Sequence, residues 1–419
     1  MTSTAIVVLL CVATTLAIAK NPERVGSFPV KHAAFTSIYR TFDKQSNRTS
    51  YDLLITAFNG VPFSTDYAYI VRDVGRYMHS VESITPQKLT DKVTWPNEIS
   101  GVPQYVFNTS MVAIPDGFLV PFKTKGGIKL VNITGSGASI PVRITEESGE
   151  DWFYHRVQWV DMDNDGDYDA LTCRARKPLF GSEEGELLWY ENPSTPSVRP
   201  GWTPHVIAKG PDVYFQHYRL NTPNGPKSCI LTAQFFTKSL SVYWTEGSDW
   251  LHLGNVKSRI IDNTIGAVFD VIVNDIGNDG NLDLLVTTND VTNGTVWAYE
   301  IPPDFRTGKF ARHMLASGFK PRNQGVGKGA PGSAFPIKYI VPQKKAPVLL
   351  SGDDDGRAYL LSAAKDDIRD WTYTLQPFLD VGMGTVGQIT VEDINKDGSL
   401  YIFVPAYTQG QVHVFHYQP

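Results

Sequence analysis

Short apolar runs recur along this chain at nearly constant intervals, and a polar or acidic turn precedes most of them. Three runs follow strongly acidic turns: Ala170–Cys173, Leu284–Thr287 and Ile402–Val404. Four others follow less regular turns: Leu53–Thr56, Phe118–Val120, Cys229–Thr232 and Val348–Ser351. The residues just before the runs are Asp52, Gly117, Asp169, Ser228, Asp283, Pro347 and Tyr401. Their mean spacing is about 58 residues, and a fixed period of that size predicts a repeat architecture.

Each run is followed by a turn and then by a second apolar or aromatic stretch, as antiparallel hairpins require. These second stretches are Tyr67–Val71, Ile128–Val131, Leu187–Glu191, Leu240–Trp244, Val296–Tyr299, Tyr359–Leu361 and Val412–Phe415. Several units add a further segment, such as Thr203–Ala208 and Phe310–Leu315. Four strands in each of seven units predict an all-β, seven-bladed β-propeller, with six or eight blades as the alternatives.

The two ends of the chain are expected to meet in one blade. The last unit stops one strand short, whereas Arg24–Val30 precedes the first complete unit. Pairing this N-terminal segment with the last unit would cover strand edges that otherwise stay open. The repeat covers almost everything from residue 20 to 419, which predicts a single domain.

Composition changes this prediction little. Aromatic residues make up 12% of the chain, and 35 Gly and 27 Pro suit many short strands and turns. The formal net charge of −5 argues against nucleic acid as the main partner.

The first residues are typical of a targeting segment. Ala5–Ala19 is almost wholly apolar, and Ala17-Ile-Ala19 is a plausible cleavage site, which predicts a signal peptide over residues 1–19. The run is short for a membrane span, and a buried first strand is the alternative. Export agrees with four predicted glycosylation sequons, at Asn47, Asn108, Asn132 and Asn293. We therefore expect a secreted, extracellular glycoprotein.

Two cysteines remain after the predicted signal peptide. Cys173 and Cys229 follow the apolar runs of neighbouring units. A disulfide between adjacent blades and a pair of buried free thiols are both compatible with this placement.

The three acidic turns carry the clearest chemistry. Carboxylates at alternate positions of a tight turn, with glycine at position 6 and a backbone carbonyl at position 7, suit the six to eight oxygen ligands of Ca²⁺. The first turn has every side-chain ligand, and its candidate ligands are Asp161, Asp163, Asp165, Asp167 and Asp169. The second turn has Gly277 at position 3; its candidates are Asp275, Asp279, Asn281 and Asp283. The third has Tyr401 at position 9; its candidates are Asp393, Asn395, Asp397 and Ser399.

The pattern Asp-x-Asp-x-Asp-Gly-x-x-Asp before an apolar strand resembles the FG-GAP/VCBS repeat of integrin-α propellers, fungal propeller lectins and some propeller lyases. The segments Leu187–Asn192 and Trp202–Ile207 are similar to strands of the same repeat. The likeness extends from about residue 24 to 419. It implies structural Ca²⁺ that braces the blades, whereas a calcium-gated or mineral-facing role is the alternative. One fold hosts many activities, so the resemblance leaves the function open.

Ligands of propellers usually bind at the mouth of the central channel, near the start of the innermost strands. Two expected inner segments are polar there, and their candidate residues are His155, Arg156, His217, Tyr218 and Arg219. Such groups could bind an anionic sugar or transfer protons, or they could simply line a wet channel. The glycine-rich loop Gly318–Ala334 could cap a ligand or be an ordinary solvated insertion.

Other catalytic signatures are absent from the sequence, which contains no Gly-x-Ser-x-Gly and no His-Glu-x-x-His motif. Two hypotheses follow. The first is a secreted, calcium-stabilised binding module for glycans or matrix proteins. The alternative is a carbohydrate-active lyase, dehydratase or isomerase that uses the channel residues.

Overall fold

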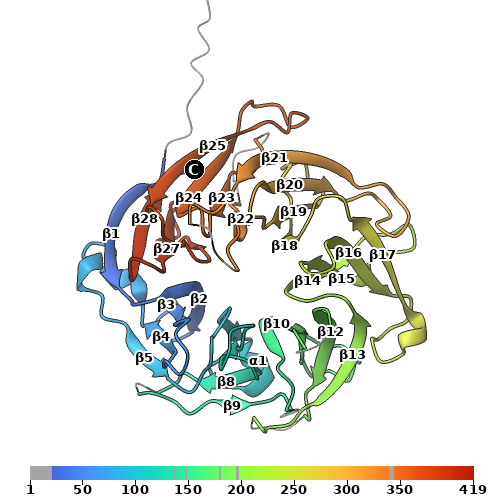
Figure 1. Cartoon of the computed structure of the whole chain (residues 1–419), viewed down its shortest axis with the longest axis horizontal. Coiled ribbons are helices and arrows are strands. Elements are labelled where there is room, and N and C mark those ends of the chain that lie inside the picture. Colours follow the sequence, from blue (N-terminus) through green and yellow to red (C-terminus); the bar gives the residue numbers. More distant parts are fainter. Residues whose placement is uncertain are drawn as a thin grey trace, which may run out of the picture.

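The computed structural model describes residues 21–419 apart from 136, 147–148, 179–180, 195–197, 324, 326 and 339–343. The predicted signal peptide therefore lies outside the described residues. The described chain forms seven four-stranded antiparallel sheets around a common axis, with β2, β10, β14, β18 and β22 nearest the centre (Figure 1). This arrangement confirms the predicted seven-bladed propeller.

The blades follow one another along the chain. Blade 1 contains β2 (Ala33–Asp43), β3 (Arg48–Ala57), β4 (Tyr67–Val71) and β5 (Gln87–Thr90). Blade 2 contains β6 (Ser100–Val102), β7 (Met111–Pro115), β8 (Ile128–Asn132) and β9 (Val142–Arg143). Blade 3 contains β10 (Phe153–Val160), β11 (Asp169–Arg176), β12 (Glu184–Glu191) and β13 (Thr203–Lys209). Blade 4 contains β14 (Tyr214–Leu220), β15 (Lys227–Gln234), β16 (Ser239–Thr245) and β17 (Val256–Asp262).

The remaining blades complete the ring. Blade 5 contains β18 (Val268–Asn274), β19 (Asp283–Thr288), β20 (Gly294–Glu300) and β21 (Ala311–Phe319). Blade 6 contains β22 (Ala334–Pro336), β23 (Val348–Ser351), β24 (Arg357–Ala363) and β25 (Tyr373–Asp380). Blade 7 contains β26 (Thr390–Glu392), β27 (Leu400–Ala406), β28 (Gln411–Tyr417) and β1 (Glu23–Pro29). The helical elements are short: α1 (Gln104–Phe107) and 3₁₀ turns at Val74–Tyr77, Val81–Ser83 and Leu253–Asn255.

Blade 7 joins the two ends of the chain. Its outer strand β1 pairs antiparallel with β28, from Glu23 opposite His416 to Pro29 opposite Gln411. The expected closure by the N-terminal segment is confirmed. Among the helices that the structure describes, none has the length and apolar character to cross a membrane.

One predicted strand is wrong. Phe118–Val120 lies in the turn between β7 and β8, and the second strand of blade 2 is Met111–Pro115. Phe118 is only partly buried, and its ring stacks on Trp95 at the surface of the disc. The apolar character of this segment therefore belongs to a surface and not to the core.

The core lies between adjacent blades, and strand alternation decides which side chains enter each interface. Cys173 packs with Phe215 and Ile230 between blades 3 and 4. Cys229 points to the opposite face of blade 4 and packs with Val271 between blades 4 and 5. Both thiols are buried and free, so the disulfide prediction is wrong and the free-thiol alternative is confirmed.

The antiparallel strands place the connections on two faces of the disc. We call the upper face the one that carries the links from second to third strands and from each fourth strand to the next blade. The lower face carries the links from first to second and from third to fourth strands. The three acidic turns join first to second strands and therefore lie on the lower face.

Candidate functional site

Aromatic rings gather on the upper face around blades 7, 1, 2 and 3. We call this surface the aromatic mouth, and it consists of His32, Phe35, Phe58, Trp95, Phe118, His155 and Tyr407. All of these side chains are partly exposed except that of His155, which is buried. Four different blades supply them, so the surface exists only in the closed ring.

Trp95 is the central ring of this surface. Phe58 stacks on Trp95 with 4.1 Å between centroids, and Phe118 stacks on it with 5.0 Å and an interplanar angle of 9°. Tyr407 lies 5.3 Å from Phe58 and 5.1 Å from His32. These contacts form one continuous aromatic surface whose outer side faces solvent.

Several upper-face aromatics have strained backbones. The φ angles are 60° at His32, 61° at Phe63, 47° at Trp95 and 66° at Phe122. Bulky residues rarely adopt positive φ, and each instance costs roughly 1–3 kcal/mol. Strain of this kind concentrates at ligand-binding and catalytic sites. Four strained aromatics on one face therefore make it a candidate functional surface.

A buried ion pair fixes the two loops that carry most of these rings. Lys123 Nζ donates to Asp66 Oδ2 at 2.7 Å, and their side chains are only 3% and 1% exposed. Lys123 also donates to the Ser64 carbonyl at 2.6 Å. Asp66 accepts backbone N–H groups of Asn59 at 2.9 Å and Trp95 at 2.7 Å. The pair thus holds the Phe58 loop, Trp95 and the Phe118 loop together.

The tips of the same two loops end in exposed rings. Phe63 is 80% exposed and Phe122 is 65% exposed, and their centroids lie 4.4 Å apart. A pocket of about 350 Å³ lies beside them. Its lining consists of Lys31, His32, Ala57, Phe58, Asn59, Ser64, Thr65, Tyr67 and Tyr69. Apolar rings beside a few amide and hydroxyl groups are the usual composition of a small-molecule site.

His155 closes the inner side of the aromatic mouth. Its ring contacts those of Phe35, Phe118, Phe153 and Tyr214, at centroid distances of 5.4–6.3 Å. The side chain is 6% exposed, and Nδ1 has no hydrogen-bond partner among the described residues. Burial, followed by repulsion from Arg156, lowers the pKa of His155 to about 3. At neutral pH it is an uncharged imidazole that can exchange hydrogen bonds with a neutral ligand.

Arg156 follows His155 on β10, and its side chain contacts residues of blades 4 and 5. Its Nε donates to Glu98 at 2.7 Å, Nη1 lies 3.5 Å from Asp270, and the guanidinium stacks 4.4 Å above Tyr214. Burial raises the pKa of both carboxyl groups, and Arg156 opposes that effect. The guanidinium is thus already paired with two carboxylates and is poorly placed to neutralise an anionic sugar.

The structure does not bring His217, Tyr218 and Arg219 to the aromatic mouth. His217 Nε2 bonds Ser228 Oγ at 2.8 Å, and its pKa is lowered to about 4, mainly by burial. Tyr218 packs on the core between blades 4 and 5, and Arg219 is exposed. Of the five candidates, His155 and Arg156 thus both contact Tyr214, whereas the other three lie farther along β14.

A carboxyl pair borders the aromatic mouth at blade 6. Asp354 accepts hydrogen bonds from Lys328 Nζ at 2.7 Å and Thr385 Oγ1 at 2.6 Å. The Thr385 carbonyl in turn accepts the N–H of Tyr407 at 3.0 Å. Burial and the neighbouring Asp354 raise the pKa of Asp353 well above its usual value. Lys328 belongs to the glycine-rich loop, so this loop is tied to blade 6 at that point.

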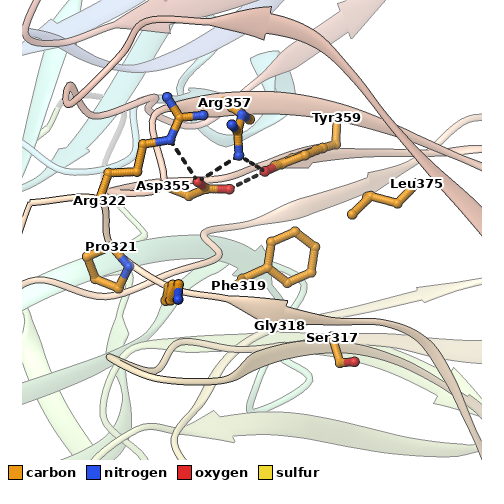
Figure 2. A pocket seen from close by; sticks show the side chains of 10 residues that line it. Ser317, Gly318, Phe319, Pro321, Arg322, Asp355, Arg357, Tyr359 and Leu375 are labelled. Atoms are coloured by element: carbon orange, nitrogen blue, oxygen red, sulfur yellow. Dashed lines mark hydrogen bonds and ion pairs between the residues drawn. The ribbon is translucent and has the colours of Figure 1, made fainter.

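A second pocket on this face, of about 390 Å³, lies between β21 and blade 6 (Figure 2). Arg322 and Arg357 both bond Asp380, at 2.7 and 3.1 Å, and both contact Asp355. Tyr359 donates its hydroxyl to Asp355. Two guanidinium groups face two carboxylates here, and the exposed Lys320 adds a further cation to the lining.

The first acidic turn gathers its carboxylates. Oxygen atoms of Asp161, Asp163 and Asp169 lie within 4.8 Å of one another, the one such acidic group among the described residues. Burial raises the pKa of Asp169 to about 7, and Asp163 and Asp165 add to this effect. Gly166 has φ 98°, which permits the bend. Crowded carboxylates of this kind fit a hard divalent cation.

The other two turns keep the bend with fewer ligands. Asp275 and Asp393 each accept two backbone N–H groups of their own turns. Position 9 of the third turn is Tyr401, which is buried in the core. Of the other candidate ligands, Asp165 and Asn281 are exposed, Asp167 is partly exposed and Ser399 is buried. All four sequon asparagines, Asn47, Asn108, Asn132 and Asn293, are exposed.

Sequence reasoning missed the aromatic mouth and its buried ion pair. Trp95, Phe58 and Tyr407 lie outside the inner strands, in connections of different blades. The unusual spacing of aromatic residues next to Gly and Pro in the upper-face loops was the available signal. Only closure of the ring makes them neighbours.

Comparisons with known proteins give a fold likeness and no family. No protein-family model and no curated protein matches the chain. Similar solved structures include a glucose dehydrogenase at 10% identity and TM-score 0.45, covering 79% of this chain and 99% of that one. The soluble aldose sugar dehydrogenase of Escherichia coli is 12% identical with a TM-score of 0.44, and the match covers 79% of this chain and 98% of that one. Another glucose dehydrogenase is 10% identical with a TM-score of 0.39, and the match covers 77% of this chain and 96% of that one. At these values the likeness carries no argument about activity or cofactor.

Proposed function

We propose that this chain is an exported propeller of FG-GAP/VCBS type that binds carbohydrate in its aromatic mouth. The observation that carries the proposal is the continuous, partly exposed ring surface around Trp95, held in a strained backbone by a buried ion pair. Sugar rings present apolar C–H faces and many hydroxyl groups, so flat aromatic rings beside uncharged polar groups suit them.

The charges of the site favour a neutral sugar. His155 is uncharged at neutral pH because its pKa is about 3, and Arg156 is engaged by Glu98 and Asp270. Neither of these two groups therefore offers free positive charge to an anionic sugar, and the exposed Lys31 in the pocket lining is a cation that such a sugar could meet. In this proposal Ca²⁺ is structural and is held by Asp161, Asp163 and Asp169. These residues lie on the lower face, whereas the sugar binds on the upper face.

The proposal is tested by screening the purified protein on a broad glycan array, followed by calorimetry with the best ligand. Trp95→Ala should weaken binding by about 2 kcal/mol, roughly thirtyfold, as removal of a central aromatic anchor does. Phe42→Ala is the matched control, because Phe42 is exposed outside the aromatic mouth. Absence of glycan binding, or equal binding by Trp95→Ala, would refute the proposal.

A second candidate function is a sugar-active enzyme that uses the same surface. It is favoured by Asp353, because burial and the neighbouring Asp354 raise the pKa of this carboxyl group well above its usual value. A carboxyl group of this kind can act as a general acid. Product analysis with the best ligand separates the two functions. The enzyme predicts turnover that Asp353→Asn abolishes while binding persists, whereas a binding module predicts no product.

A further inference from the structure

The lower face holds an unusual buried lysine beside the second acidic turn. Lys345 is 3% exposed, and its Nζ has no hydrogen-bond partner among the described residues. The adjacent Ala346 donates its N–H to the carbonyl of Ile276, inside the second turn, at 2.9 Å. Blade 6 therefore delivers an ammonium group to the acidic turn of blade 5.

The surroundings of Lys345 explain how its charge is tolerated. Its Nζ lies 4.3 Å from the Trp371 ring centroid, a cation–π contact. Burial lowers the pKa of Lys345, and the carboxylates of Asp283 and Asp279 are the leading influences in the opposite direction. These carboxylates act at longer range than a direct ion pair, and burial still raises the pKa of Asp283 to about 7. A buried ammonium without hydrogen bonds depends on such neighbours.

The first acidic turn has no lysine at the matching contact. There the carbonyl of Met162 accepts the N–H of Trp250 from blade 4, at 2.8 Å. The residue before Trp250 is Asp249, whereas the residue before Ala346 is Lys345. The Asp249 carboxylate accepts hydrogen bonds from Leu251 and His252 of its own loop, so the residue at this position brings no ammonium group to the first turn.

The ligand set of the second turn differs as well. Gly277 stands where the first turn has Asp163, so one carboxylate is missing. Asp283 Oδ2 accepts two backbone N–H groups, from Ile276 at 2.9 Å and Gly277 at 2.8 Å. Asp169 Oδ2 accepts the N–H of Met162 at 2.9 Å. Asp169 Oδ1 accepts a second backbone N–H, from Asn192 at 2.9 Å, so the backbone uses both carboxylates equally and the two turns differ in the ligand missing at Gly277.

We infer that the second acidic turn takes no Ca²⁺, and that Lys345 of the next blade supplies its positive charge instead. A divalent ion there would have three carboxylates rather than four and would lie close to a buried ammonium group. Coulomb repulsion between the ion and this ammonium group acts against the metal. The turn then works as an electrostatic contact between blades 5 and 6, whereas the first turn keeps its place for a cation.

Calcium stoichiometry tests this inference directly. The full chain is freed of metal with a chelator and titrated with Ca²⁺ by calorimetry. Asp163→Asn should lower the stoichiometry by one ion per chain, and Asp279→Asn in the second turn should leave it unchanged. A loss of one ion in Asp279→Asn would overturn the inference. So would an unchanged stoichiometry in Asp163→Asn, because the two turns would then not differ.

Thermal unfolding gives a second readout that does not depend on activity. Lys345→Met should enlarge the difference in Tm between Ca²⁺ and chelator, since the carboxylates lose their resident cation. Lys344→Met is the matched control, because Lys344 is more exposed and pairs with Asp366 at 3.2 Å. An unchanged or smaller difference in Lys345→Met would contradict the role given to this lysine.

Discussion

The buried pair of Lys123 and Asp66 allows a sharp test of how the aromatic mouth is held. Lys123→Met removes the ammonium but leaves a carboxylate that is 1% exposed. Two backbone N–H donors, from Asn59 and Trp95, still reach Asp66. Removing one partner of a buried pair typically destabilises by about 3–5 kcal/mol, because the other charge stays buried. Unfolding entropy of about 2.1 cal/mol/K per residue converts this loss into a Tm lower by roughly 3–6 °C.

The assay is urea unfolding followed by tryptophan fluorescence. The double variant Lys123→Met/Asp66→Asn should recover about 1–3 kcal/mol relative to the sum of the single variants, because no unpaired charge remains. Lys125→Met is the control, since Lys125 is exposed in the same loop, and it should stay within about 0.5 kcal/mol of wild type. A loss below about 1 kcal/mol in Lys123→Met, or strict additivity in the double variant, would refute this reasoning.

Three further predictions concern other parts of the molecule. His155 has a pKa of about 3 in the fold, so the unfolded chain binds its proton first as the pH falls below about 6.5. The free energy of unfolding should therefore fall by about 2 kcal/mol between pH 7 and pH 5 from this residue alone. In His155→Gln the fall in the unfolding free energy over the same pH range should be smaller by that amount. Burial raises the pKa of Cys173 well above its usual value and that of Cys229 to about 12. Both thiols should resist alkylation at pH 8 until denaturant is added, and rapid modification of the native protein would show that they are accessible. The double variant Phe63→Ser/Phe122→Ser should keep its unfolding free energy within about 1 kcal/mol of wild type, because the rings are exposed, yet bind the array-selected glycan more weakly. Unchanged affinity would exclude the loop tips from the site.

The fold was predictable because each blade repeats one local pattern. The runs after Asp169, Asp283 and Tyr401 are core strands, since a tight turn followed by four apolar residues has few other uses in a propeller. The same rule failed at Phe118, where an apolar run serves the surface. Hydrophobicity alone does not distinguish an aromatic ring that packs between blades from one that is partly exposed on the surface.

The site was less predictable because it depends on pairs that are distant in sequence. Lys123 and Asp66 come from loops of different blades, and nothing in either loop announces a buried ion pair. The sequence identifies His155 as a candidate because an imidazole can transfer protons. In the fold, burial lowers the pKa of His155 to about 3, so it is uncharged at neutral pH and a weak base. His217, which has the same side chain on the next inner strand, faces a blade interface instead.

The central claim is that a sugar lies against Trp95 and His155 on the upper face. A crystal structure of the protein with the best array ligand measures this directly. The account predicts a sugar ring stacked on the Trp95 surface, with a hydroxyl group within hydrogen-bond distance of His155. A sugar bound elsewhere, with the aromatic mouth left to solvent, would contradict it.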